Sequence, residues 1–435
     1  MQRRNFYQFV IPSIGAAVVT SLYFVVDGIF VGNGVGAMAL ACINLAVPFI
    51  CLISAVDMMI TMGGATLTAI HFGRGDVAKA NATFRLTMAM VITVALTMMV
   101  VSSLFAPQLA RLMGASEMLV PGTAEYLRFY VMFAIFFSSS MMLAAFVRND
   151  GNPRLAFWGM IVGALSNVAL DWLFIFPLQM GIKGAAIASG LGQVMACLVL
   201  STHFLTKRGD LRLGLPRVHF HTMRQIVKTG APEFITQMSQ PVLIFCYNYL
   251  VIRILGEMGV AAFSVVSYIV VIVVGIFIGL GEGLQPLMSF SHGAGDTMAQ
   301  QHYFRKGLRV NVTLAAICYG VLFVFGRQII AVFNDDPALI EMAYDCVRVY
   351  GLCFLFAAAN IVFTIYNLST QRTKQALIIA GLRSFVASVF FIFLMPAIFG
   401  DGALWTGIVV AEAAVLVVAI AIGGPGRKRE KAKVK

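Results

Sequence analysis

The chain has 435 residues, of which 60% are hydrophobic and 11% are charged, with a mean hydropathy of +0.89. A soluble globular protein has about 25% charged residues, so this composition excludes a water-soluble fold. A membrane-spanning helix needs about 20 apolar residues, so the length accommodates about a dozen spans and leaves no soluble catalytic domain. The 31 Lys and Arg against 19 Asp and Glu give a net charge of +12, which in a membrane protein is first a topology signal.

Hydrophobic runs bounded by Gly, Pro or charged residues predict an all-α polytopic membrane protein with twelve transmembrane helices. The predicted spans lie near residues 8–32, 40–70, 84–110, 123–147, 153–177, 182–206, 224–253, 259–290, 306–328, 340–367, 373–398 and 402–422. The longest polar stretch separates the sixth span from the seventh. We therefore predict four segments, namely an N-lobe at 1–206, a cytoplasmic basic linker at 207–223, a C-lobe at 224–422 and a basic cytoplasmic tail at 423–435.

The two halves repeat each other at an offset of 220 residues. Pro12 pairs with Pro232, and the loop 73–76 pairs with the loop 293–296 through two glycines and an aspartate. Because each unit holds six helices, both units insert in the same orientation and are parallel repeats. Parallel repeats of this kind are typical of secondary transporters that bind their substrate near the membrane midplane.

The distribution of the cations predicts the orientation in the membrane. Of the 31 Lys and Arg, 24 fall on one side, which also carries both termini. The positive-inside rule therefore places both termini in the cytoplasm, in agreement with an even number of spans. Topology explains the basic C-terminal tail, and we expect no nucleic-acid partner.

Six of the acidic residues within the predicted spans are candidates for the membrane interior, although each ionised carboxylate at mid-membrane costs about 2.5–3.5 kcal/mol. Only Arg383 is predicted to be a buried cation beside them. The excess of acids predicts an interior cavity that accepts cations or protons. The roles of Asp57 and Glu233 stay open, since solvated helix ends would also explain them. The six acids are Asp27, Asp57, Asp171, Glu233, Glu282 and Glu412.

One cluster of polar residues is predicted in the first half. Asn167 and Asp171 are four residues apart and share a helix face, Ser189 follows on the next helix, and Asp27 supplies a second carboxylate. These oxygens would suit Na⁺, and two carboxylates in one apolar pocket would also share a proton. The second half cannot build the same site, because Tyr247 stands at the counterpart position of Asp27.

The chain resembles the multidrug and toxic compound extrusion (MATE) family over nearly its whole length. In that family an N-lobe cation site uses an Asp on helix 1, an Asn and an Asp on helix 5 and a hydroxyl on helix 6. Asp27, Asn167, Asp171 and Ser189 match these positions, with Ser where Thr often occurs. The resemblance rests on the twelve-helix repeat, Pro12 with Asp27, the Gly-rich segment 32–39, the loop glycines of 73–76 and 293–296, and GlyAsnPro at 151–153.

The second half departs from this pattern. Some members carry an Asp on helix 10, whereas the corresponding segment here has Asn360 and no acid. We expect a different C-lobe network of Glu282, Arg383 and Glu412, with either glutamate as the partner of the arginine. Glu282 and Gln285 lie in a predicted bend of their helix and are expected to face the cavity. The candidate substrate contacts of the second half are therefore Glu282, Gln285, Arg383, Glu412, Asn360 and Tyr247.

The resemblance implies an antiporter in the bacterial inner membrane that exports organic cations in exchange for H⁺ or Na⁺. Between these two ions the sequence leaves the choice open. The alternative is a related flippase for lipid-linked oligosaccharides, whose anionic substrate would need a cationic cavity. A membrane-embedded enzyme would need a loop with clustered catalytic residues, and the loops are short and lack one, so we expect no enzymatic activity. We also expect a monomer, small cationic substrates, the lipid bilayer as surroundings, and no cofactor besides the coupling ion.

Overall fold

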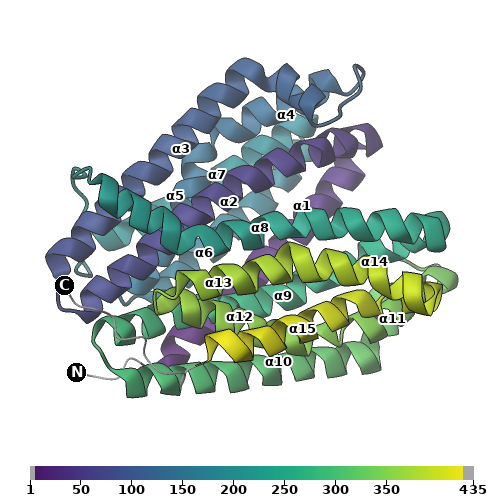
Figure 1. The fold of residues 1–435 in the computed structure, drawn as a ribbon. Helices are drawn as coiled ribbons and strands as arrows, with labels where there is room; N and C mark the ends of the chain where they lie inside the picture. The colour runs from purple at the N-terminus through teal and green to yellow at the C-terminus, as the bar shows by residue number, and fades with distance from the viewer. Residues whose placement is uncertain (1–4, 425–435) are drawn as a thin grey trace.

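The computed structural model describes residues 5–424, and it describes their side chains apart from positions 24, 29, 31–33, 37, 40 and 240. Most of the predicted basic tail lies outside this range. Helices α1 to α7 form the first half of the fold, drawn purple to teal in Figure 1. They are α1 (Phe6–Val35), α2 (Ala37–Gly73), α3 (Val77–Leu112), α4 (Val120–Met132), α5 (Ala134–Asn149), α6 (Pro153–Ile175) and α7 (Gly181–Leu205).

The second half, drawn teal to yellow, follows a segment at residues 206–219 that has no helix. Its helices are α8 (Phe220–Ile254), α9 (Gly256–Gly293), α10 (Thr297–Ala331), α11 (Pro337–Tyr350), α12 (Cys353–Ser369), α13 (Thr373–Gly381), α14 (Ala387–Phe399) and α15 (Thr406–Gly423). A π-helical segment, η1 (Leu382–Val386), joins α13 to α14, and a short 3₁₀ turn, η2 (Asp401–Ala403), precedes α15.

Within residues 5–424, nine helical segments are long and apolar enough to cross a membrane, and two bent pairs raise the number to eleven. The pairs α4–α5 and α11–α12 bend by 48° and 46° at the predicted spans 123–147 and 340–367. Helix α8 is the twelfth span, although its N-terminal half carries several charged residues that lower its hydropathy. The protein is a multi-pass membrane protein with the predicted twelve-helix architecture.

The repeated loops show why the same residues occur at both positions. Gly75 and Gly295 adopt φ angles of 76° and 71°, a conformation that other residues rarely adopt. The following aspartates then cap the next helix, since Asp76 accepts from Lys79 N and Asp296 accepts from Ala299 N. The Lys79 side chain, together with this backbone bond, holds the pKa of Asp76 below its usual value.

The two halves meet along α1 and α2 on one side and α8 and α9 on the other. Near one end, Gly73 of α2 lies so close to α9 that a Cβ atom would collide with the Phe290 carbonyl oxygen. The symmetric contact occurs at Gly293, where a Cβ atom would collide with the Ile70 carbonyl oxygen. Figure 1 shows the halves converging at this end, which also holds both described termini, and diverging toward the other end.

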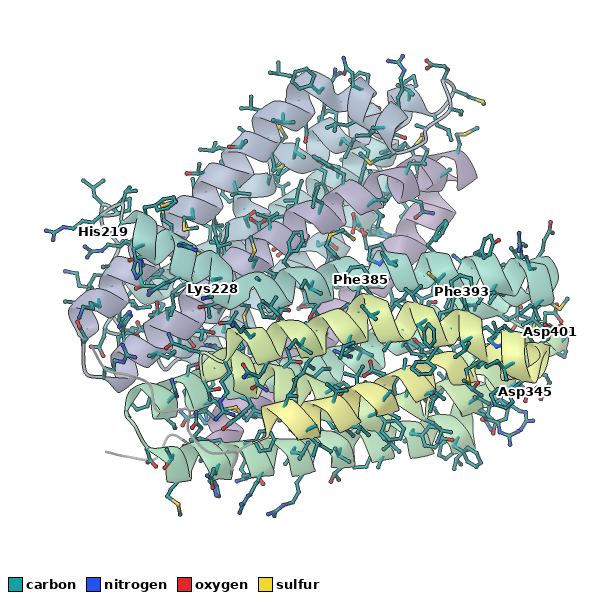
Figure 2. The ribbon with its side chains drawn as sticks, in the orientation of Figure 1. His219, Lys228, Asp345, Phe385, Phe393 and Asp401 are labelled. Carbon is teal, nitrogen blue, oxygen red and sulfur yellow. The ribbon has the colours of Figure 1, made fainter. Side chains whose placement is uncertain are left out.

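The surface has an apolar belt between two polar ends. Phe393 and its neighbours on α14 and α15 are exposed, as lipid-facing residues of a membrane protein are. In Figure 2, His219 and Lys228 lie toward the end where the halves converge, and Asp345 and Asp401 lie at the opposite end. These four polar residues therefore lie at the two ends of the molecule, outside the apolar belt.

Candidate functional site

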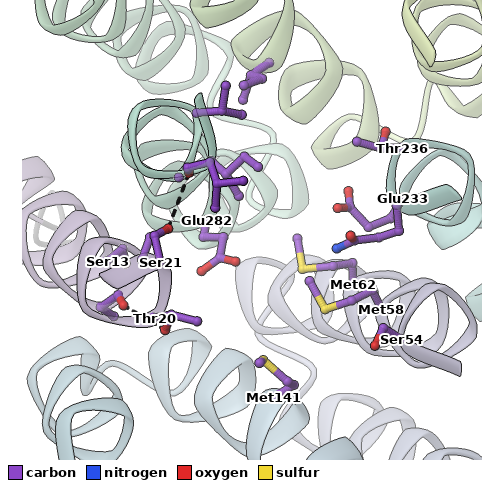
Figure 3. Close-up of a pocket in the computed structure, with 18 of the residues that line it drawn as sticks. Ser13, Thr20, Ser21, Ser54, Met58, Met62, Met141, Glu233, Thr236 and Glu282 are labelled. Carbon is purple, nitrogen blue, oxygen red and sulfur yellow. Dashed lines mark hydrogen bonds between the residues drawn. The ribbon is translucent and has the colours of Figure 1, made fainter. Parts of the chain in front are cut away.

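A cavity of about 470 Å³ lies between the two halves and is lined by helices from both. Pro12 of α1 and Asp57 of α2 belong to its first-half wall, and Glu233 of α8 and Glu282 of α9 belong to its second-half wall. Figure 3 shows Glu233 and Glu282 beside this opening, together with several methionines. The wall is therefore mixed, with carboxylates set among apolar side chains.

On the second-half wall, Glu412 of α15 is the partner of Arg383. Arg383 Nε lies 2.8 Å from Glu412 Oε1, and the Asn360 amide donates to Glu412 Oε2 at 2.7 Å and to the Glu412 carbonyl at 2.9 Å. Arg383 belongs to the π-helical segment, whose wider turn is a common way for a helix to present a functional side chain. The predicted ion pair is confirmed, and Glu412 rather than Glu282 completes it.

Glu282 pairs across the cavity with Arg148, at 2.5 Å, and Arg148 also lies 3.4 Å from Ser13 Oγ. The expectation that Arg383 is the one buried cation was therefore wrong. Arg148 is only 8% exposed although it lies one residue before the end of α5, where a polar loop follows. The loop pattern indicated exposure, but the side chain points back between the two halves and meets the carboxylate of α9.

Two other predicted cavity residues lie elsewhere. Gln285 is buried between the halves and donates to Thr66 Oγ1 at 3.1 Å, and α9 continues through Pro286 as one helix. Tyr247 is 1% exposed and packs in an aromatic cluster, with its ring 5.1 Å from Phe263 and 5.8 Å from Trp405. Both predictions of a cavity position were wrong, because the apolar face of a helix does not show which neighbour covers it.

The four residues of the predicted ion site come together inside the first half. Asn167 Nδ2 donates to Ser189 Oγ at 3.2 Å, and the carboxyl groups of Asp27 and Asp171 lie within hydrogen-bonding reach of each other. Asn167, Asp171 and Ser189 are 2%, 0% and 7% exposed, and none of the four lines the central cavity. The group therefore forms a pocket separate from the central cavity.

The chemistry of this pocket follows from the lack of hydrogen-bond donors to its carboxyl oxygens. The Asn167 amide lies near Asp171, but it donates its hydrogen bond to Ser189. Neither oxygen of Asp171 therefore accepts a hydrogen bond from the described residues, and Asp27 Oδ1 does not accept one either. Two adjoining carboxylates without donors repel each other in a medium of low dielectric constant. A proton or a small cation between them would remove this repulsion.

Three tyrosines surround the ion pocket and were not predicted from the sequence. Tyr23 lies beside Ser189 and near both carboxyl groups, Tyr126 of α4 is also near both, and Tyr130 of α4 is near Asp27. Tyr130 also lines the central cavity, and its ring lies 4.6 Å from Phe137. The spacing of Tyr23 four residues before Asp27 on one helix face was the signal available in the sequence.

Comparison of the sequence with known protein families agrees with the two-half architecture. The model of the MatE family matches residues 12–173 and 232–394, two stretches whose starts are 220 residues apart like the repeat itself. The chain belongs to the MATE family. Curated relatives of this MATE protein include the multidrug export protein MepA of Staphylococcus saprophyticus, 24% identical with 96% of this chain and 93% of the relative covered. MepA of Staphylococcus aureus is 23% identical over 95% and 92% of the two chains.

Solved structures share the fold of this MATE protein. One, of a MATE protein in complex with MaL6, has a TM-score of 0.91 at 21% identity. A second, described as the outward-facing conformation of a multidrug resistance MATE family transporter, has a TM-score of 0.89 at 21% identity. In both cases 96% of this chain and 94% of the other are covered. The predicted family and fold class are confirmed.

Proposed function

We propose that this MATE protein is a multidrug efflux transporter that exports organic cations in exchange for H⁺ or Na⁺. The observation that supports this most directly is the Asp27–Asp171 pair, two adjoining carboxyl groups in which both Asp171 oxygens and Asp27 Oδ1 are buried and lack a hydrogen-bond donor. A pair of this kind binds a proton or a cation in one state and releases it in another. The curated MepA relatives, which are named as multidrug exporters, support the efflux part of the proposal.

The central cavity is the proposed substrate site. It lies between the halves, whereas the ion pocket lies within the first half, so ion and substrate would bind at separate places. Antiport then requires that the two ligands stabilise different arrangements of the lobes. The close contacts at Gly73 and Gly293 support an arrangement that is closed at the end carrying the termini.

The proposed location is the bacterial inner membrane, with both termini in the cytoplasm. Lys228 at the converging end, together with the excess of Lys and Arg predicted for the side that carries the termini, supports this orientation. The closed end would then face the cytoplasm and the cavity would open outward. We propose that a single chain suffices, because the cavity and the ion pocket are each formed by residues of one chain.

The flippase alternative has less support. An anionic lipid-linked substrate would need free cations in the cavity, but the lining arginines, Arg148 and Arg383, are each paired with a glutamate. The described lining residues hold four carboxylates against these two guanidinium groups. A cavity with this charge favours positively charged ligands.

Purified protein in liposomes loaded with ethidium would test the proposal. We expect dye efflux when either a pH gradient or a Na⁺ gradient is imposed separately, and the effective gradient identifies the coupling ion. An anionic dye of similar size should not be exported. Equal export of the anion, or no response to either gradient, would contradict cation antiport.

Replacing Asp27 with Asn should abolish the gradient-driven step. The substitution preserves size and hydrogen bonding but removes one charge of the pair, so the pocket no longer needs a proton or cation to relieve repulsion. We expect efflux to fall at least tenfold while expression and folding are retained, since an expensive buried charge is lost. Full coupled transport in Asp27→Asn would show that the ion is carried elsewhere.

A further inference from the structure

The charges that line the central cavity do not cancel. Four carboxylates lie among the described lining residues, and two of them are neutralised, Glu282 by Arg148 and Glu412 by Arg383. The other two are Asp57 on the first-half wall and Glu233 on the second-half wall. Glu233 stands near the charges of Glu282 and Arg383, whereas Asp57 lies on the other wall among hydroxyl groups and methionines.

One face of α2 carries buried, unpartnered oxygens on residues that line the cavity. Ser54, Asp57 and Thr61 are spaced by three and four residues, and all three line the cavity. Asp57 is 6% exposed, and its Oδ2 accepts a hydrogen bond from Ser138 Oγ, but its Oδ1 has no partner. Thr61 is 1% exposed, and its hydroxyl has no partner either.

The free hydroxyl of Thr61 is a departure from the usual behaviour of a helical threonine. Thr83 and Thr87 on α3 each donate to the carbonyl four residues earlier, at 2.9 and 2.8 Å. Thr61 makes no such bond, although a buried hydroxyl without a partner is unfavourable. Two unsatisfied oxygens one helical turn apart, one of them from a carboxylate, indicate a site for a ligand that donates hydrogen bonds.

The surroundings of these oxygens suit an apolar molecule with one charged end. Met58 and Met62 follow Asp57 and Thr61 in the sequence of α2, and all four residues line the cavity. Figure 3 shows these two methionines and Met141 of α5 at the cavity. Methionine side chains adapt to ligands of different shape. The Tyr130 and Phe137 rings stack at 4.6 Å in the same wall and can contact a cation through their faces.

We propose that Asp57 and Thr61 form a subsite of the cavity that binds protonated amines and amidinium groups. Ser138 orients the Asp57 carboxylate by donating a hydrogen bond to it. The inference rests on the proposed export function and adds a substrate class to it. Asp57 supplies the charge, and the free oxygens accept N–H bonds. A quaternary ammonium group has no N–H to donate, so it would leave these oxygens unsatisfied. The subsite therefore prefers cations that donate hydrogen bonds over quaternary cations of similar shape.

Binding to the purified full chain in lipid nanodiscs tests this preference without any ion gradient. The probes are octylamine, which is protonated at pH 7, and octyltrimethylammonium, measured by titration calorimetry against empty nanodiscs. We expect the wild-type protein to bind octylamine at least tenfold more tightly than the quaternary probe. Asp57→Asn and Thr61→Val should each reduce this ratio to about threefold or less.

Control variants show whether a change in the binding ratio comes from the proposed subsite. Thr68→Val removes another buried, unpartnered hydroxyl of α2 that does not line the cavity, and it should leave the ratio unchanged. An unchanged ratio in both Asp57→Asn and Thr61→Val, or a ratio lost in Glu233→Gln instead, would overturn the proposal. Absence of any preference in the wild-type protein would also overturn it. A preference without gradient-driven efflux would instead contradict the antiport function and leave the subsite standing.

Discussion

The carboxylate of Glu412 depends on two neighbours for its stability. It is 7% exposed and is held by the Arg383 guanidinium and the Asn360 amide. A buried charge of this kind is tolerated only when its partner stays in place, because the loss of one partner leaves the other uncompensated. The pair therefore stabilises the second half as a unit, and its two members should not act independently when they are replaced.

Replacing Arg383 with Gln should lower the free energy of unfolding by about 3 kcal/mol, because Glu412 loses its countercharge. This is the lower end of the usual range for a buried pair, since the cavity still admits some water. The double variant with Glu412→Gln should recover most of that loss. Unfolding in mixtures of detergent and SDS, followed by Trp fluorescence, would measure both. Strictly additive losses in the double-mutant cycle would argue against energetic coupling of the pair.

At the scale of elements, the segment between the halves is attached to the first half. Asp150, just after α5, accepts hydrogen bonds from the backbone N–H of Asp210 at 2.9 Å and of Leu211 at 3.1 Å. His203 Nε2 lies 2.8 Å from the same carboxylate, and Asn81 Nδ2 donates to the Asp210 carbonyl at 3.0 Å. Residues 209–212 should therefore move with the first half.

Asp150→Ala should release this segment, because two backbone donors and a buried histidine lose their shared acceptor. We expect limited trypsin digestion of the folded protein to cut after Arg208 and Arg212 at least fivefold faster. Arg217 lies beyond the attached residues and is exposed, so cleavage there is the internal control. Equal acceleration at all three sites would indicate general unfolding rather than release of the segment.

At the scale of the whole molecule, backbone contact between the halves depends on the absence of side chains. Gly73 and Gly293 occupy symmetric positions where α2 and α9 cross, and each faces a carbonyl oxygen of the other helix. The Arg148–Glu282 ion pair also joins the halves near the cavity. An arrangement closed at this end is therefore stabilised by packing of α1 and α2 against α8 and α9, and an alternating-access step would have to break part of this packing.

Gly293→Ala should prevent full closure at this end, since the added methyl group meets backbone atoms that cannot rotate away. Spin labels at the exposed positions Val77 and Met298, in a variant without native cysteines, should report a longer distance between the halves by pulsed electron paramagnetic resonance. Gly320→Ala on α10 is the control, because its Cβ would meet open space. Equal distance distributions in the two variants would show that the glycine contact does not control closure.

The sequence by itself determined the features that are local or repeated. Twelve apolar runs, the 220-residue repeat and the turn residues Gly75 and Asp76 are properties of short segments, so periodicity and spacing were sufficient to predict them. The Asn167 and Asp171 part of the ion pocket was predictable for the same reason, since four residues on one helix make one turn. Asp27 and Ser189 were added from two further apolar spans because they are polar residues, and the family resemblance assigns the same four positions to a cation site.

Only the tertiary structure decided which helices face each other across the molecule. The partner of Glu282 is Arg148, 134 residues earlier in the chain, and the pair exists because α5 and α9 approach from different halves. Gln285 and Tyr247 are polar residues in apolar helices, yet one lies at the contact between the halves and the other in an aromatic core. A hydrophobic pattern records which residues avoid water or lipid, but the partner of a buried charge is set by packing between segments distant in sequence.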